Sequence, residues 1–131
     1  MTGKITVGTI QDTAGNTVAS TFVTSGSTKA YIDIPNGIAS INKSVNVSTL
    51  TDAGVGDGAV NFTNNFDSTF YAIAAAANHH PTTTSVMYQH DISHGTQLSS
   101  SYDFEVVYWN ASNHRTNGDI RSHSQLVGDL A

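Results

Sequence analysis

Cysteine is absent from the 131-residue chain, which excludes disulfide bonds, thiolate nucleophiles and cysteine zinc sites. Charge is sparse, because five Lys and Arg face ten Asp and Glu, for a formal net charge of −5. So few cations disfavour a protein that binds along nucleic-acid phosphates. No apolar run approaches the roughly 20 residues of a membrane helix. We therefore expect no nucleic-acid partner and no membrane insertion.

Small polar residues take the place of charge. Ser, Thr, Asn and Gly together supply 54 of the 131 residues. All four are poor or mediocre helix formers, so the composition favours short strands joined by tight turns. The length corresponds to about one domain, since domains cluster at roughly 100–150 residues.

Alternating apolar and polar residues predict a series of strands in the second part of the chain. The stretch 44–50 has the clearest period of two and predicts a half-buried strand. Residues 70–77 are rich in alanine, yet they are few and lie between strands, so we predict a buried strand. A loop of Gly and Asp is predicted over 51–58. The other predicted strands are 30–34, 59–63, 82–89, 102–109 and 120–130.

Residues 1–28 hold too few large apolar side chains for a core of their own. They contain a short strand signal near residues 5–9, a turn at 12–16 and a weak strand at 18–23. We predict an N-terminal arm or anchor over 1–28 and a sandwich domain over 29–131. The fold class is all-β: an antiparallel β-sandwich of jelly-roll or immunoglobulin-like type, preceded by an extended N-terminal arm. The apolar residues of the arm that we assign to assembly are Ile5, Val7, Ile10, Val18 and Phe22.

One segment resembles a known family. Residues 44–64, SVNVSTLTDAGVGDGAVNFTN, resemble a module of tailed-phage virion proteins of the tail-fibre or decoration type. The Phe-Tyr-Ala-Ile sequence at 70–73 stands where that family has a Tyr-Ala strand. Residues 5–16 and 127–131 look like the segments that begin and end such chains. The sequence departs from the pattern at 57–60, where Asp-Gly-Ala-Val replaces Asp-Tyr-Thr-Val, and residues 79–94 have no counterpart.

This resemblance implies a location in the virion, on the tail fibre or the capsid surface. It also implies a β-sandwich that forms a homotrimer. The arm would then fix each trimer to other phage virion proteins of the tail or capsid.

Six histidines raise the question of a metal site. His90 and His94 are four residues apart, a spacing that places two imidazoles on one face of a helix. Here the segment has the composition of a loop, and no Glu lies between them. Polar loop histidines are therefore the favoured interpretation, and we expect no metal and no cofactor.

The acidic residues do not indicate catalysis. Nine Asp and the single Glu105 are present, and most Asp stand beside Gly, Asn, Ser or Thr, as is typical of turns. A Gly-x-Ser-x-Gly motif is absent, and the glycines at 54–58 lack the Lys and helix of a phosphate loop. We therefore expect a protein that is not an enzyme.

Binding residues tend to lie on loops held by a rigid scaffold. Tyr88 borders the histidine-rich segment and Trp109 precedes a polar stretch, and aromatics with a polar tip suit recognition of glycans or proteins. We predict a receptor site on the loops 79–84, 88–94 and 110–115. Its candidate residues are Tyr88, His79, His80, His90, His94, Trp109, Asn110, Asn113 and Arg115.

Three functions remain open at this point. The leading hypothesis is a non-enzymatic virion protein of fibre type that trimerises, anchors through its arm and attaches to a host-surface glycan or protein. The first alternative is a capsid decoration protein that stabilises the shell. The second alternative is an isolated carbohydrate-binding module.

Overall fold

A computed structural model describes residues 8–19, 26–35, 37–78, 87–92, 96–109, 112, 114–119 and 121–131; of Met87 and Tyr88 it describes the backbone alone. The elements whose bounds the structure gives in these ranges are all β-strands. The strands are β1 (Thr9–Gln11), β2 (Thr17–Ala19), β3 (Thr28–Ile34), β4 (Lys43–Val45), β5 (Val47–Gly54), β6 (Asp57–Phe62), β7 (Ala72–Ala77), β8 (Met87–Asp91), β9 (Ser101–Trp109), β10 (Arg115–Asn117) and β11 (Ser122–Val127). In the described ranges, no helix has the length and apolar character needed to cross a membrane.

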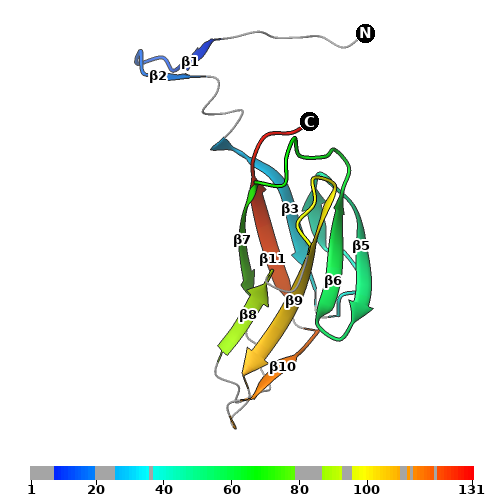
Figure 1. Cartoon of the computed structure of the whole chain (residues 1–131). Helices are drawn as coiled ribbons and strands as arrows, with labels where there is room; N and C mark the ends of the chain where they lie inside the picture. Colours follow the sequence, from blue (N-terminus) through cyan, green and yellow to red (C-terminus); the bar gives the residue numbers. More distant parts are fainter. Residues whose placement is uncertain are drawn as a thin grey trace.

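Two antiparallel sheets pack face to face (Figure 1). One sheet has the order β4-β3-β11-β7. In the other, β5 pairs with β6, β6 with β9, and β9 with both β10 and β8. The predicted all-β antiparallel sandwich is confirmed.

The core follows from the alternation of side chains along the strands. Tyr102, Phe104 and Val106 of β9 point inward and are buried. From the facing sheet, Ile32 on β3 and Leu126 on β11 are fully buried. Aromatic rings close one end of this core, where the rings of Phe62, Phe66 and Tyr71 pack with centroids 4.3–5.7 Å apart.

The single strand predicted over 44–50 is wrong, because Asn46 interrupts it. Asn46 adopts a left-handed conformation with φ of 56°, so β4 ends in one sheet and β5 begins in the other. Its side chain accepts a hydrogen bond from the Asn64 amide at 2.7 Å and donates one to the Asn64 carbonyl at 3.0 Å. These bonds hold the crossing between the sheets. Most of β4 and β5 is exposed, and Val47 and Leu50 are the residues of the predicted half-buried face that pack against the core.

Two further predictions need correction. The loop predicted over 51–58 is instead a tight hairpin, in which β5 runs to Gly54 and β6 starts at Asp57. Of residues 70–77, only Ala72–Ala77 form a strand, β7, and its side chains alternate between exposed and half-buried. The reason is its position at the edge of its sheet, where β11 is its partner.

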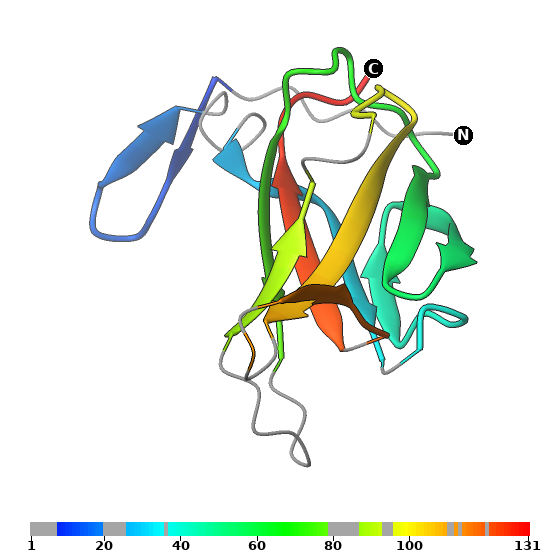
Figure 2. The same cartoon turned by 60° about the horizontal axis from the view of Figure 1, so that its bottom comes forward.

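Residues 8–19 form a hairpin that stands apart from the sandwich (Figures 1 and 2). The turn is fixed by Asp12, whose carboxylate accepts bonds from the amides of Ala14 and Asn16, both at 2.9 Å. The described part of the arm is thus a hairpin rather than an extended chain. Ile10 and Val18 oppose each other across it and are 47% and 43% exposed.

Candidate functional site

The structure describes only some of the predicted receptor residues. Trp109 and Arg115 are described with their side chains, and Tyr88 with its backbone alone. His90 is also described, but it is buried, as discussed below. Those that lie outside the described residues are His79, His80, His94, Asn110 and Asn113, together with Ile5, Val7 and Phe22 of the arm.

Three strands bring Trp109 and Arg115 together. Trp109 on β9 is the direct partner of Arg115 on β10 and of Met87 on β8. Further along β9, Glu105 stands opposite Asp91 on β8. Because side chains alternate along a strand, Glu105 and Trp109 point away from the core-facing residues of β9. These side chains therefore share the outer face of the sheet.

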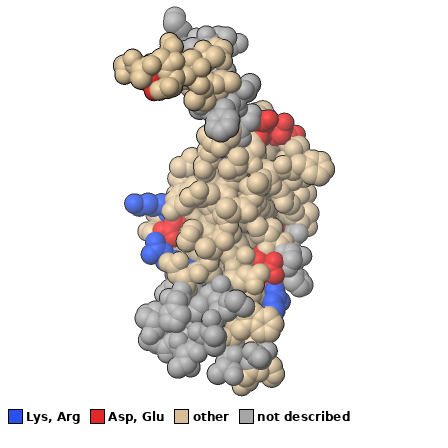
Figure 3. Space-filling view, turned by 90° about the vertical axis from the view of Figure 1, so that its left-hand side faces the viewer, with Lys and Arg blue, Asp and Glu red and all other residues tan. Residues whose placement is uncertain are grey.

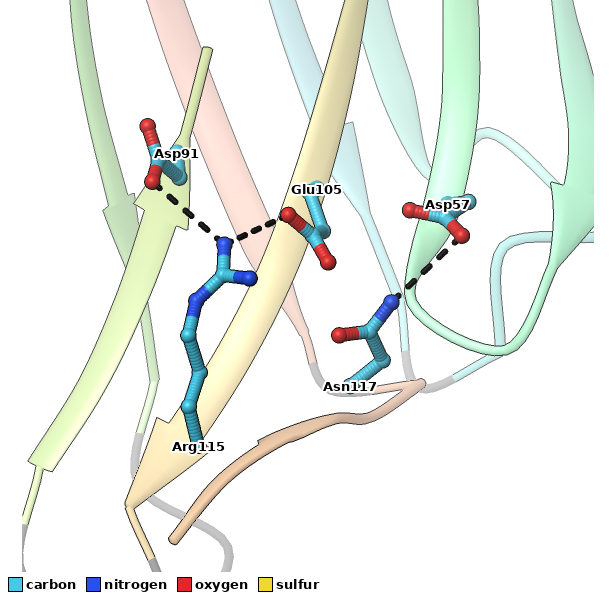
Figure 4. A network of polar contacts seen from close by, with 5 residues as sticks. All are labelled: Asp57, Asp91, Glu105, Arg115 and Asn117. Atoms are coloured by element: carbon cyan, nitrogen blue, oxygen red, sulfur yellow. Dashed lines mark hydrogen bonds and ion pairs between the residues drawn. The ribbon is translucent and has the colours of Figure 1, made fainter. Parts of the chain in front are cut away.

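Arg115 is the centre of this face (Figure 4). Its Nη2 lies 2.5 Å from Oε2 of Glu105 and 3.5 Å from Oδ2 of Asp91. The Glu105 side chain is only 7% exposed, whereas the Arg115 side chain is 36% exposed. The guanidinium thus neutralises a buried carboxylate and still reaches solvent.

Asp57 and Asn117 extend the face toward β6. Asp57 is the direct partner of Glu105, and Nδ2 of Asn117 donates to its carboxylate at 3.4 Å. The backbone beneath is braced by two bonds at Val106, which donates to the Gly56 carbonyl at 2.7 Å and accepts from the Gly118 amide at 3.0 Å. The face is therefore presented by cross-linked strands.

The electrostatics of the face restrict what it can bind. Asp57, Glu105 and Asp91 lie on three adjacent strands and repel one another, while Arg115 is the cation among them. Three carboxylates against one guanidinium disfavour an anionic ligand. Carboxylate oxygens accept bonds from hydroxyls, the guanidinium and the Asn117 amide donate them, and Trp109 offers an aromatic surface. This set suits a hydroxyl-rich, uncharged ligand.

Charge is sparse elsewhere on the surface. Figure 3 shows one side of the molecule, on which blue and red atoms gather at a few small spots on a largely uncharged surface. On this side of the molecule, a ligand would therefore meet hydrogen-bonding groups and surface shape more than a strong electrostatic field.

His90 points to the opposite side of β8 from Asp91. Its ring stacks on Phe104 with centroids 4.8 Å apart, and the residue is 8% exposed. Burial lowers the pKa of His90 to about 4, so the imidazole is neutral at pH 7. Such a placement does not suit a surface contact. Within the described ranges, no group of three or more His, Asp or Glu side chains is arranged to hold a metal ion.

A small hollow lies at the other end of the sandwich. It has a volume of about 200 Å³ and is lined by Asp67, Ser68, Phe70, Tyr71, Gly128 and Asp129. Phe70 beside it is 94% exposed. The sequence assigned Phe70 to a buried strand, so this exposed ring was not predicted.

The sequence also missed three acids and one amide of the face, namely Asp57, Asp91, Glu105 and Asn117. The Asp residues carried turn-like neighbours, which gave them a structural explanation. Glu105 offered the one usable signal, because an acid in the middle of the strand-like run Tyr-Asp-Phe-Glu-Val-Val-Tyr-Trp requires a cation once the strand is buried. Comparisons with protein families, with curated proteins and with solved structures find no match to this chain.

Proposed function

We propose that this chain is a non-enzymatic structural protein of a tailed-phage virion, of fibre type and homotrimeric. It anchors through the N-terminal arm and presents the sandwich to a glycan or protein of the host surface. The observation that carries this proposal is that the two ends of the sandwich carry different features. The hairpin and Ala131 lie at one end of the sandwich, and the strand ends bearing Trp109 and Arg115 lie at the other (Figure 1).

Two other features support an attachment role. The outer face of the β8–β9–β10 region is called here the Arg115 face, and its side chains are those of Asp57, Asp91, Glu105, Trp109, Arg115 and Asn117. It combines an aromatic side chain with carboxylate, amide and guanidinium groups, a set that can bind hydroxyls without catalysis. The segment whose sequence resembles phage virion modules, residues 44–64, forms most of β4 together with β5 and β6. Strand β6 lends Asp57 to the face, so the resemblance covers part of the scaffold that supports it.

A second candidate is a capsid decoration protein, and one observation favours it. Large apolar side chains are exposed at the hairpin end of the sandwich, where Phe70, Leu98 and Leu130 lie on connected loops. Exposed apolar surface of this kind marks contact with another protein. On a capsid, this apolar end of the sandwich would be the surface that contacts the shell subunits.

Antibody labelling of intact virions under the electron microscope separates the two candidates. Label at the tail is the result expected for the fibre protein, and label spread over the capsid would establish the decoration protein. Absence of label on any particle would overturn both.

Attachment itself is tested with the purified protein on host cells. Trp109→Ala is expected to weaken cell binding at least about tenfold, as for an aromatic at the centre of an interface. Phe70→Ala is the matched control, since this exposed aromatic precedes β7 and lines the hollow, away from the strand ends that bear Trp109 and Arg115. Equal binding by both variants would remove the Arg115 face from the receptor site.

A further inference from the structure

Two buried polar side chains have no hydrogen-bond partner in the part of the chain that the structure describes. Both ring nitrogens of His90 on β8 and the hydroxyl of Ser122 on β11 are unpaired. His90 is 8% exposed and Ser122 is fully buried. Buried polar groups normally have hydrogen-bond partners. Two buried groups without partners therefore indicate either a site that destabilises the fold or a site with a function.

The two groups lie at the same level of the sandwich. The hydrogen bond between Tyr102 on β9 and Ser124 on β11 aligns the two sheets. From this bond toward the β8–β10 end, the next inward residues are Phe104 on β9 and Ser122 on β11 (Figure 1). The His90 ring stacks on Phe104. The imidazole and the Ser122 hydroxyl therefore flank one layer of the core.

Strand β7 completes this layer. Ala77 is the direct partner of Ser122, and β7 lies beside β8 (Figures 1 and 2). The two strands belong to different sheets, so the seam between them depends on side-chain packing rather than on a ladder of backbone bonds. The side chains of β7 are those of five alanines and Ile73, which fill little space.

Among the residues that the structure describes, the surroundings of His90 offer no counter-ion on the inner face. Strand β7 contributes no titratable side chain. On β11, His123 lies on the opposite side from the inward Ser122 and Ser124, and as a like charge it lowers the pKa of His90 further. On β9, Glu105 points to the outer face and is paired with Arg115. On β8 itself, Asp91 also points outward and contacts Arg115. An imidazolium at His90 would be both buried and unpaired.

We propose that neutral His90 is an acid-sensitive latch, and that its protonation displaces β8 from the seam with β7 and separates Asp91 from Arg115. His90 and Asp91 are adjacent on one strand and face opposite sides of it, so movement of β8 changes both faces at once. The consequence for attachment rests on the proposed function, because it assumes that the Arg115 face binds the receptor. The latch itself does not.

The sign of the pH dependence follows from the two states. In the closed state the pKa of His90 is lowered to about 4, chiefly by burial and further by His123, with Asp91 opposing. A solvated imidazole has a pKa of about 6.5. The open state therefore binds the proton first. The closed seam is favoured above about pH 6.5 and loses its advantage as the pH falls toward 4.

The test uses Trp109, the single tryptophan of the chain, which is the backbone partner of Met87 on β8. Its emission and its quenching by acrylamide are followed as the pH is lowered from about 7.5 to about 4, with far-UV circular dichroism as the measure of the whole sandwich. We expect a red shift and about a twofold rise in quenching, while the circular dichroism is retained. His90→Phe, which keeps a ring on Phe104, and His90→Leu as a second variant abolish the transition.

Two further variants sharpen the test. His123→Gln removes the like charge, which raises the pKa of His90 in the closed state and shifts the midpoint of opening to lower pH. His114→Gln, before β10, leaves it unchanged. The latch is overturned if the transition persists in a folded His90 variant, if Trp109 does not respond in the wild type, or if Trp109 and the circular dichroism change in one step. Loss of cell binding at pH 7.5 with an intact fluorescence transition would count against the proposed function and not against the latch.

Discussion

The phenolic hydroxyl of Tyr102 on β9 and the hydroxyl of Ser124 on β11 lie 2.5 Å apart, in a hydrogen bond that joins the two sheets. Both residues are fully buried. Tyr102→Phe leaves the Ser124 hydroxyl without this partner. We expect the free energy of unfolding to fall by about 1–3 kcal/mol, the cost of a buried unsatisfied group. Urea unfolding followed by circular dichroism measures the loss.

The double variant Tyr102→Phe with Ser124→Ala is the control for this bond. Removing both partners avoids the unsatisfied hydroxyl, so the double variant is expected to be more stable than Tyr102→Phe alone. If the two losses simply add, the hydrogen bond is not the source of the effect.

Gly56 illustrates a close approach of two backbones. It adopts φ of 75° in the β5–β6 turn, and a Cβ there would lie 2.6 Å from the Val106 carbonyl oxygen and 2.7 Å from the Gly118 nitrogen. Gly56→Ala is expected to cost about 2–4 kcal/mol, from the left-handed backbone together with the clash. Thermal unfolding monitored by calorimetry tests it.

Gly37 provides the matched control, because its φ is 86° and a Cβ would meet no atom within 4 Å. Gly37→Ala is expected to lower the free energy of unfolding only by the cost of a left-handed backbone conformation, about 1 kcal/mol. Equal losses in the two variants would show that the contact with Val106 has no energetic weight.

Features of the fold that depend on neighbouring residues could be predicted from the sequence, whereas features that depend on contacts between distant residues could not. Strand β9 was recognisable because aromatic and β-branched residues fill it and alternate with polar ones. The break at Asn46 was not, because the alternation continues across it. What breaks the strand is a pair of bonds to Asn64, 18 residues away, which no local pattern reveals.

The candidate site was less accessible to prediction for the same reason. Trp109 and Arg115 were named from loop composition, but their pairing is a matter of register between β9 and β10. Glu105 and Asp91 join them only because β8 pairs with the other edge of β9. His90 was assigned to an exposed loop, and its burial follows from the same pairing, which turns it toward Phe104.

Asp33 predicts a second pH effect, distinct from that of His90. Its buried carboxylate accepts bonds from Arg121 at 2.8 and 3.1 Å and from Asn42 at 2.7 Å, and these bonds hold the pKa of Asp33 below its usual value. The carboxylate therefore stabilises the fold above about pH 4, and this contribution is lost as the pH falls through the lowered pKa. Asp33→Asn is expected to lower stability at pH 7 by about 1–2 kcal/mol and to flatten the dependence below pH 4. Urea midpoints measured between pH 7 and pH 2.5 report both.

Arg121→Gln is the companion variant, since Arg121 is the largest cause of the lowered pKa. It is expected to reduce the same acid dependence while leaving Asp33 in place. An unchanged dependence in Arg121→Gln would assign the effect to another carboxylate.

The hairpin bears on assembly, because Ile10 and Val18 present an exposed apolar pair on an element that stands apart from the sandwich. A two-stranded hairpin by itself is at best marginally stable in water, so a binding partner would stabilise it. If the chain trimerises through its arm, Ile10→Ser with Val18→Ser is expected to convert trimer to monomer in light scattering. The melting temperature of the sandwich should remain unchanged, as for exposed substitutions in general.

Val55→Ser is the control, since this valine is 62% exposed in the β5–β6 turn. A double variant that stays trimeric would place the interface on the sandwich, and the apolar loops around Phe70 would then be the surface to alter next.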